Sequence, residues 1–151
     1  MAEKQYVVFR LDNEEYGIGI MNVREIIPYK ESIKVPNTPD FIEGIINYRG
    51  NVTPIICLKK RFNISKRVED GNTRIIVINI GDRQVGFIVD EASQTIKLDE
   101  SEIDPAPSIV SSVEREYIDG VGKKEDRLII LIDLGKILTE GEREELKGID
   151  A

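Results

Sequence analysis

Two stretches decide the fold, YVVFRLDNEEYGIGIMNVREII at Tyr6–Ile27 and IIVINIGDRQVGFIVDEASQTI at Ile75–Ile96. They align without a gap at an offset of 69 residues, so that apolar positions fall on apolar positions and Gly17 falls on Gly86. Any two strand-turn-strand segments share an apolar alternation. The shared glycine is harder to explain in that way, and it favours an internal repeat.

A second match follows in the same order. Gly44 aligns with Gly120, and Ile55–Leu58 aligns with Leu131–Leu134, at an offset of 76 residues. The second half therefore carries about seven additional residues between its two matching segments. Because both segments recur in the same order, we interpret the chain as two copies of one structural unit.

Each copy is predicted to be a small β structure of five strands. The chain contains 25 Ile and 12 Val but only 4 Ala and 8 Leu, and residues branched at Cβ suit a pleated sheet better than a helix. Apolar runs bounded by polar turns predict the following strands: 6–11, 16–20, 23–29, 44–48, 52–58, 75–80, 85–89, 93–98, 120–124 and 128–133. Pro54 inside the fifth run predicts an edge or bulge position.

The remaining segments are predicted to be connectors and short helices, at 59–71, 111–118 and 136–146. We therefore expect a first β-barrel subdomain with its connector at 1–70, and a second with a C-terminal helix at 71–151. A unit of about 60 residues buries too little surface to be stable alone. The two barrels should pack together, and the join between them should form a binding groove.

Composition excludes several classes of function. The chain has no histidine, which excludes the usual catalytic triads and imidazole metal sites. Cys57 is the only cysteine and lies in an apolar run, so we expect it to be buried and structural. No glycine-rich phosphate loop, membrane span or secretory signal is recognisable. We expect no enzymatic activity, no cofactor and no metal.

The segment GIINYRGNVTPII at 44–56 places Arg49 in a tight turn beside Gly50. It resembles the signature of the CheW family, the adaptors of bacterial chemotaxis. Further segments at 15–26, 37–44, 85–90 and 127–134 resemble the same family, so that the resemblance covers about residues 6–139. Tyr48 stands where the family usually has Leu, and Cys57 where it usually has Asp.

The resemblance implies two five-stranded SH3-like barrels and an adaptor function without catalysis. Such proteins link the cytoplasmic tip of chemoreceptors to the regulatory domain of the histidine kinase CheA. They are cytoplasmic, do not insert into the membrane, and are recruited to receptor arrays at its inner face. By motif position, the residues implied in receptor binding are Val23, Glu25, Ile26, Asn47, Arg49 and Ile88.

Glu25 and Arg49 are the most informative pair, because a guanidinium can hold a carboxylate through a planar two-bonded fork. We hypothesise that they face each other and exchange this internal pair for receptor contacts. An ion pair without functional consequence is an equally open interpretation at this stage.

The resemblance also implies kinase contacts on the second barrel. The segment at 104–109 resembles the contact loop of the family, which assigns Asp104, Ser108 and Ile109 to kinase binding. Relatives often have Arg at the position of Asp104. A connector loop whose Ile109 side chain folds inward is the alternative interpretation.

Two other functions stay open at this stage. One is a fragment of a chemotaxis kinase that resembles its regulatory domain. The other is a small-barrel binder of single-stranded nucleic acid, which would need basic and aromatic residues along one face. The net charge of −7, and a total of 9 Phe and Tyr residues among 151, argue against nucleic-acid binding.

Overall fold

The computed structural model describes residues 3–64, 70–106 and 117–137, and these form an almost entirely β structure. The strands are β1 (Glu3–Leu11), β2 (Glu14–Gly19), β3 (Val23–Pro28), β4 (Ile42–Tyr48), β5 (Asn51–Cys57), β6 (Arg74–Ile80), β7 (Arg83–Val89), β8 (Glu91–Asp99), β9 (Ile103–Asp104), β10 (Ile118–Lys124) and β11 (Arg127–Ile132). The short helical segments are η1 (Ile20–Asn22), α1 (Leu58–Arg61), η2 (Glu100–Glu102) and η3 (Leu134–Lys136). Every predicted strand is present, and β9 is additional. The helices predicted at 111–118 and 136–146 fall almost entirely outside the described residues.

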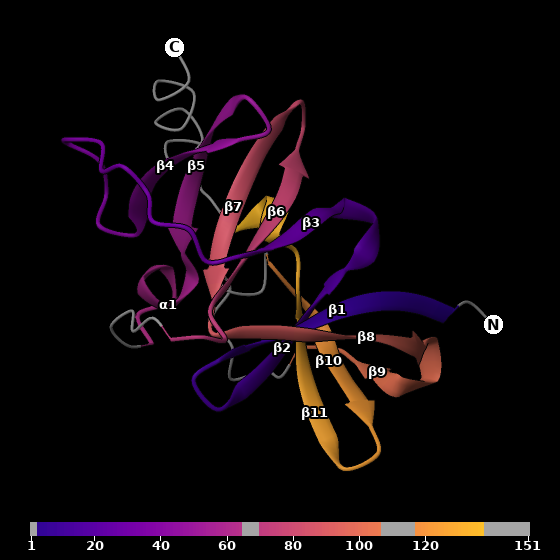
Figure 1. Cartoon of the computed structure of the whole chain (residues 1–151). Helices are drawn as coiled ribbons and strands as arrows, with labels where there is room; N and C mark the ends of the chain where they lie inside the picture. Colours follow the sequence, from indigo (N-terminus) through magenta and orange to yellow (C-terminus); the bar gives the residue numbers. More distant parts are fainter. Residues whose placement is uncertain (1–2, 65–69, 107–116, 138–151) are drawn as a thin grey trace.

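The strands form two sheets with matching strand order (Figure 1). One sheet has the order β8-β1-β2-β11-β10-β9 and the other β3-β6-β7-β5-β4. Taken in these orders, the first five strands of the larger sheet are the repeat counterparts of the five strands of the smaller sheet. For example, β8 corresponds to β3, and β10 corresponds to β4. The registers agree as well, because Val8 pairs with Gly17 in one sheet and Val77 with Gly86 in the other. The internal repeat predicted from the sequence is thus confirmed in three dimensions.

The boundary predicted at residue 70 does not separate the two sheets. The β1–β2 hairpin belongs to the six-stranded sheet, together with β8–β11 from the second half. The β6–β7 hairpin belongs to the five-stranded sheet, together with β3–β5 from the first half. Each spatial unit therefore combines both ranges, 1–70 and 71–151. The repeat could not reveal this exchange, because a hairpin has the same apolar pattern whichever copy it pairs with.

Two glycines form equivalent bulges. The register shifts between Ile42 and Gly44 in β4, and at the corresponding place before Gly120 in β10. A Cβ atom at Gly44 would lie 2.2 Å from the carbonyl oxygen of Ile33, and one at Gly120 would lie 2.6 Å from that of Asp104. Only glycine allows the neighbouring backbone to approach so closely.

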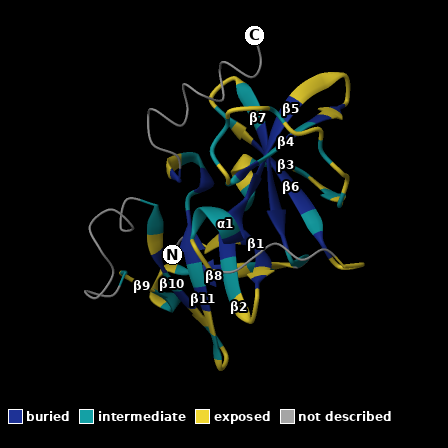
Figure 2. Cartoon of the chain, turned by 90° about the vertical axis from the view of Figure 1, so that its left-hand side faces the viewer, coloured by how far each residue is buried: buried dark blue, intermediate teal, exposed yellow. Residues whose placement is uncertain are grey.

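Buried residues are concentrated in the strands of both sheets (Figure 2), and most of the core lies between those sheets. Alternate residues of β1, β6 and β7 point into this central cluster, and the others point into the barrel interiors. These strands are buried on both faces, which explains their nearly continuous apolar sequences. The central cluster comprises Val7, Phe9, Leu11, Ile18, Ile42, Ile56, Leu58, Ile76, Ile78, Val85, Phe87, Val89, Ile132, Leu134 and Ile137. The join between the sheets is thus mainly packed core, and only part of it forms a groove.

Pro54 lies in an internal strand, where an edge or bulge position had been expected. It pairs with Ile45 of β4, whose N–H and C=O are both hydrogen-bonded to Ile33 on the other side. The pairing of β5 with β7 begins only at Ile55. The missing N–H of proline therefore removes no ladder bond, which is why an internal strand tolerates it.

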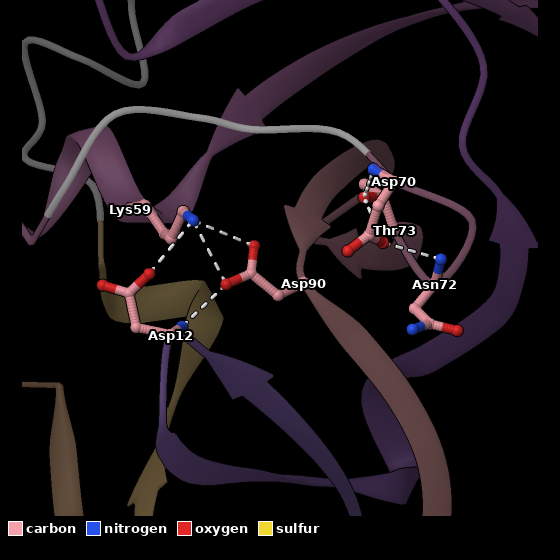
Figure 3. Close-up of polar contacts among 6 residues, drawn as sticks. All are labelled: Asp12, Lys59, Asp70, Asn72, Thr73 and Asp90. Atoms are coloured by element: carbon pink, nitrogen blue, oxygen red, sulfur yellow. Dashed lines mark hydrogen bonds and ion pairs between the residues drawn. The ribbon is translucent and has the colours of Figure 1, made fainter.

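A buried lysine joins elements of the two sheets (Figure 3). The Nζ atom of Lys59 in α1 lies 3.2 Å from a carboxylate oxygen of Asp12 and 3.1 Å from one of Asp90. The backbone N–H of Asp12 donates to Asp90 at 2.7 Å. Burial acts to lower the pKa of Lys59, but the hydrogen bonds to Asp90 and Asp12 outweigh it, and the pKa is raised. This cluster fixes the β1–β2 turn to α1 and to the β7–β8 crossover.

Candidate functional site

A polar cluster of Glu25, Tyr48 and Arg49 lies at the closure of the five-stranded barrel. One carboxylate oxygen of Glu25 accepts hydrogen bonds from the Tyr48 hydroxyl at 2.6 Å and from the Arg49 guanidinium at 2.8 and 3.1 Å. Glu25 lies on β3 and Tyr48 at the end of β4, which are the two outer strands of this sheet. The cluster therefore brings together side chains from the two outer strands of the sheet.

The backbone of the β4–β5 turn presents Arg49 to solvent. Arg49 and Gly50 both have positive φ, at 50° and 85°. Positive φ at both central residues is typical of the type I′ turn that suits a two-residue hairpin. The side chain of Asn47 accepts a hydrogen bond from the N–H of Gly50 at 2.9 Å, so this predicted site residue shapes the turn.

The cluster is charged and accessible. The Arg49 side chain is 63% exposed and that of Glu25 is 36% exposed. Hydrogen bonds from Tyr48 and then from Arg49 hold the pKa of Glu25 below its usual value, so the carboxylate is ionised at neutral pH. Because the pair lies near water, a partner of suitable charge can compete for either member at little desolvation cost.

Val23 and Ile26 lie near the cluster on β3. Val23 begins the strand, pairs with Ile78 of β6 and packs partly against the central core. Ile78 and Asn22 line a cavity of about 370 Å³ between the two sheets. Ile26 is 37% exposed. The structure thus places Val23 beside the inter-sheet cavity and Glu25 two residues further along the same edge strand.

Ile88 does not share this surface. It is only 4% exposed and packs inside the five-stranded barrel with Tyr48, Ile55 and Ile75. Its side chain is not available to a partner in this conformation, because alternation along β7 directs it inward. Of the six residues assigned to receptor binding, Ile88 is buried away from the others, and Ile26, adjacent to Glu25 on β3, points to the opposite face of that strand.

Tyr48 is the member of the cluster that sequence reasoning missed. Its departure from the family pattern was visible as a replacement of Leu. Its hydroxyl reaches Glu25, while its ring lies 5.6 Å from the Arg49 guanidinium carbon and packs within the barrel core. A tyrosine at a position that normally holds an aliphatic residue was the available signal, because a buried phenol needs a hydrogen-bond partner.

Of the residues assigned to kinase binding, Asp104 is the one that the structure describes, and it belongs to the other sheet. Asp104 is exposed at the end of β9 and forms an ion pair with Lys123 at 3.0 Å. Ser108 and Ile109 lie outside the described residues. Asp104 and Ile33 occupy equivalent places, because each carbonyl faces one of the two bulge glycines.

Cys57 is 1% exposed at the end of β5, and burial raises the pKa of its thiol. This confirms its predicted burial. Among the described residues, no group of three or more Cys, Asp or Glu side chains is placed to hold a metal ion. In the described parts of the chain there is also no helix long and apolar enough to cross a membrane.

The sequence model of the CheW-like domain matches residues 5–142. The chain belongs to the CheW-like family. A relative from Klebsiella aerogenes, "Chemotaxis protein CheW", is 41% identical over 139 residues, covering 92% of this chain and 84% of the relative. The chemotaxis protein CheW of Bacillus subtilis is 38% identical over 137 residues, covering 91% and 88%.

The comparison with solved structures agrees. The scaffolding protein TtCheW from Thermoanaerobacter tengcongensis superposes with a TM-score of 0.83 at 39% identity, covering 94% of this chain and 92% of that one. The CheW-like fold of two SH3-like barrels, expected from the resemblance, is therefore confirmed.

Proposed function

We propose that this protein is a chemotaxis adaptor that couples chemoreceptors to the regulatory domain of the histidine kinase CheA. The family membership supports the scaffolding function, since its relatives are named chemotaxis and scaffolding proteins. The protein performs no reaction of its own in this account. It works in the cytoplasm, at receptor arrays on the inner face of the membrane.

The observation that carries the receptor contact is the Glu25–Tyr48–Arg49 cluster. Both charges of its ion pair are accessible, and Glu25 lies two residues after Val23, which follows the cavity-lining Asn22. A helical receptor hairpin would offer apolar side chains to Val23 and Ile26 and polar groups to the ion pair. In this proposal Glu25 and Arg49 exchange their internal bonds for receptor contacts, and Asn47 keeps the turn in shape. Ile88 supports Tyr48 from within the barrel.

The kinase contact is proposed at Asp104, which lies on the opposite sheet, together with Ser108 and Ile109. Placing the two contacts on different sheets would let one molecule bind both partners at once. Neither alternative function has comparable support. The chain covers 84% of the chemotaxis protein CheW of Klebsiella aerogenes and 88% of that of Bacillus subtilis, and a net charge of −7 disfavours nucleic acid.

Co-sedimentation tests the adaptor function directly. Receptor tips displayed on vesicles should sediment CheA from the same organism only when the purified chain is added. With Arg49→Glu, the chain should remain bound to the kinase but leave the vesicles. If the wild-type chain fails to increase kinase in the pellet, the adaptor proposal is wrong.

A further inference from the structure

The internal repeat creates two equivalent joints between the sheets. The first joint lies where α1 meets the β1–β2 turn and the β7–β8 crossover, and there the buried Lys59 bridges Asp12 and Asp90 (Figure 3). The second joint lies where η3 meets the β6–β7 turn and η1, which connects β2 to β3. The residues that correspond there to Lys59, Asp12 and Asp90 are Gly135, Gly81 and Met21.

The inter-sheet cavity of about 370 Å³ lies at the second joint. Both glycines of this joint line it. Its apolar floor is formed by Ile18, Ile78 and Ile132, which belong to the central core. Met21 is 91% exposed and precedes the cavity-lining Asn22. The joint is open because the side chains at the equivalent positions are absent or lie in solvent.

Two polar groups of this cavity lack a partner among the described residues. Tyr6 is 8% exposed, and its hydroxyl forms no hydrogen bond with any described side chain or backbone group. The carboxylate of Asp119 forms neither an ion pair nor a hydrogen bond within the described part of the chain. Polar groups of largely buried residues normally have a partner, so this pair of acceptors is exceptional.

The electrostatics of the cavity favour a positive charge beside Asp119. Burial, and then the charge of Asp133, raise the pKa of Asp119, while Lys136 and Lys4 act in the opposite direction. Burial, and then the charge of Asp119, raise the pKa of the Tyr6 phenol. A cation close to Asp119 would therefore stabilise its ionised form.

The repeat shows what Asp119 is missing. Its counterpart in the five-stranded barrel is Glu43, which forms an ion pair with Lys60 at 2.9 Å. Lys136 corresponds to Lys60, but in the described structure it forms no ion pair with Asp119. At the first joint the chain thus supplies its own lysines, whereas at the second it leaves the acid unpaired.

We propose that the inter-sheet cavity binds a Lys or Arg side chain of the receptor segment that docks at β3. The methylene stem lies on the apolar floor, and the cationic N–H groups donate to Asp119 and to the Tyr6 oxygen. An apolar side chain would leave both acceptors without a donor, and an acidic one would be repelled by Asp119. Asn22 lines the cavity and precedes Val23, so a segment on β3 passes its opening. The partner thereby closes the second joint as Lys59 closes the first.

The binding chemistry can be tested on the isolated chain. The labelled chain is titrated with N-acetyl-lysine methylamide, and the backbone amide signals of Gly81 and Gly135 are followed by NMR. The expected result is a saturable shift, which Asp119→Asn abolishes. Asp126→Asn, in the β10–β11 turn, is the matched control and should leave the titration unchanged. N-acetyl-norleucine methylamide, which has an apolar stem without the charge, should bind about tenfold more weakly.

Two further measurements separate binding from folding. Asp119→Asn should not lower the melting temperature, because burial disfavours the charge that it removes. Tyr6→Phe removes the hydroxyl alone and should weaken binding of the lysine probe about fivefold, the loss expected for one hydrogen bond.

Three results would overturn the inference. They are the absence of a saturable shift in the wild-type chain, an equal shift in Asp119→Asn, and tighter binding of the norleucine probe than of the lysine probe. The last result would mean that the cavity selects an apolar side chain.

The identity of the partner rests on the proposed function, and binding to receptor tips separates the two. Asp119→Asn should weaken tip binding about tenfold, the loss expected for a charged hydrogen bond. If tip binding depends on Arg49 but not on Asp119, the inference fails and the proposed function stands. If the wild-type chain binds no tips while the lysine probe still binds, the proposed function fails and the chemistry of the cavity stands.

Discussion

At the scale of single residues, the phenol of Tyr48 organises the candidate site. Its hydroxyl bonds the same Glu25 oxygen that Arg49 bonds, so one acceptor atom holds two donors from the end of β4 and its turn. Sequence reasoning predicted that Glu25 and Arg49 would meet, and the ion pair confirms this. Sequence reasoning could not predict that Tyr48 joins them. The alternation of residues along a strand predicts which face a side chain lies on, but it does not predict which strand ends meet where the barrel closes.

Replacing Tyr48 tests this arrangement. Tyr48→Phe removes the largest of the contributions that lower the pKa of Glu25, and so the pKa of that carboxyl should rise towards its usual value. NMR titration of the side-chain carboxyl signals measures it. Tyr16→Phe in the other sheet is the control and should leave the Glu25 titration unchanged. An unchanged pKa in Tyr48→Phe would show that the phenol does not stabilise the ionised form.

The Glu15–Arg127 pair gives a pH dependence with a definite sign. Hydrogen bonding from Arg127 lowers the pKa of Glu15, although burial acts in the opposite direction. The pair therefore stabilises the fold above pH about 4.5, the ordinary value for Glu, and this contribution is lost as the pH falls through the lower, folded value. In urea titrations, the wild-type chain should have a higher free energy of unfolding than Glu15→Gln at neutral pH. This difference should become smaller as the pH falls below about 4.5. A constant difference down to pH 2 would contradict the assignment.

At the scale of elements, the sequence repeat indicated that Gly44 and Gly120 are equivalent, but it did not predict that each forms a bulge. Gly44 and Gly120 aligned in the repeat, but a strand pattern does not show that another backbone passes against a glycine. The reason became visible only with the register shifts beside both residues. The extra strand β9 was missed for a related reason, since two residues are too few to form a periodic pattern.

Substitution of Gly44 should reveal this constraint. Gly44→Ala would place a Cβ atom 2.2 Å from the Ile33 carbonyl oxygen, at a backbone φ of 151°. Backbone cannot move aside as easily as a side chain, so we expect a loss of at least about 2 kcal/mol in the free energy of unfolding. Gly19→Ala, where nothing lies within 4 Å, is the control. Equal effects of the two substitutions in urea unfolding would argue against the close approach.

At the scale of the whole molecule, the exchange of hairpins makes the two copies interdependent. Each sheet needs the hairpin of the other copy, and the Lys59 cluster ties the β1–β2 turn to α1. The fold class and the repeat were predictable because apolar patterns are local properties of the sequence. The partner of each hairpin was not, since pairing across copies depends on tertiary packing.

Dividing the chain tests the exchange. Fragments 1–70 and 71–151 should each lack dispersed NMR signals when expressed alone, because each sheet would be missing its hairpin from the other half. Mixing or co-expressing them should restore the spectrum of the intact chain. Two fragments that fold separately and do not associate would contradict the strand order.

The most direct test of the whole account is reconstituted kinase control with the ion pair reversed. Arg49→Glu and Glu25→Arg should each abolish control of the kinase by receptors and leave the melting temperature nearly unchanged, because both side chains are accessible. Glu125 occupies the equivalent turn position in the other sheet, also with positive φ, so Glu125→Arg is the matched control and should retain control. Normal kinase control by both single reversals would contradict the proposal that this cluster binds the receptor.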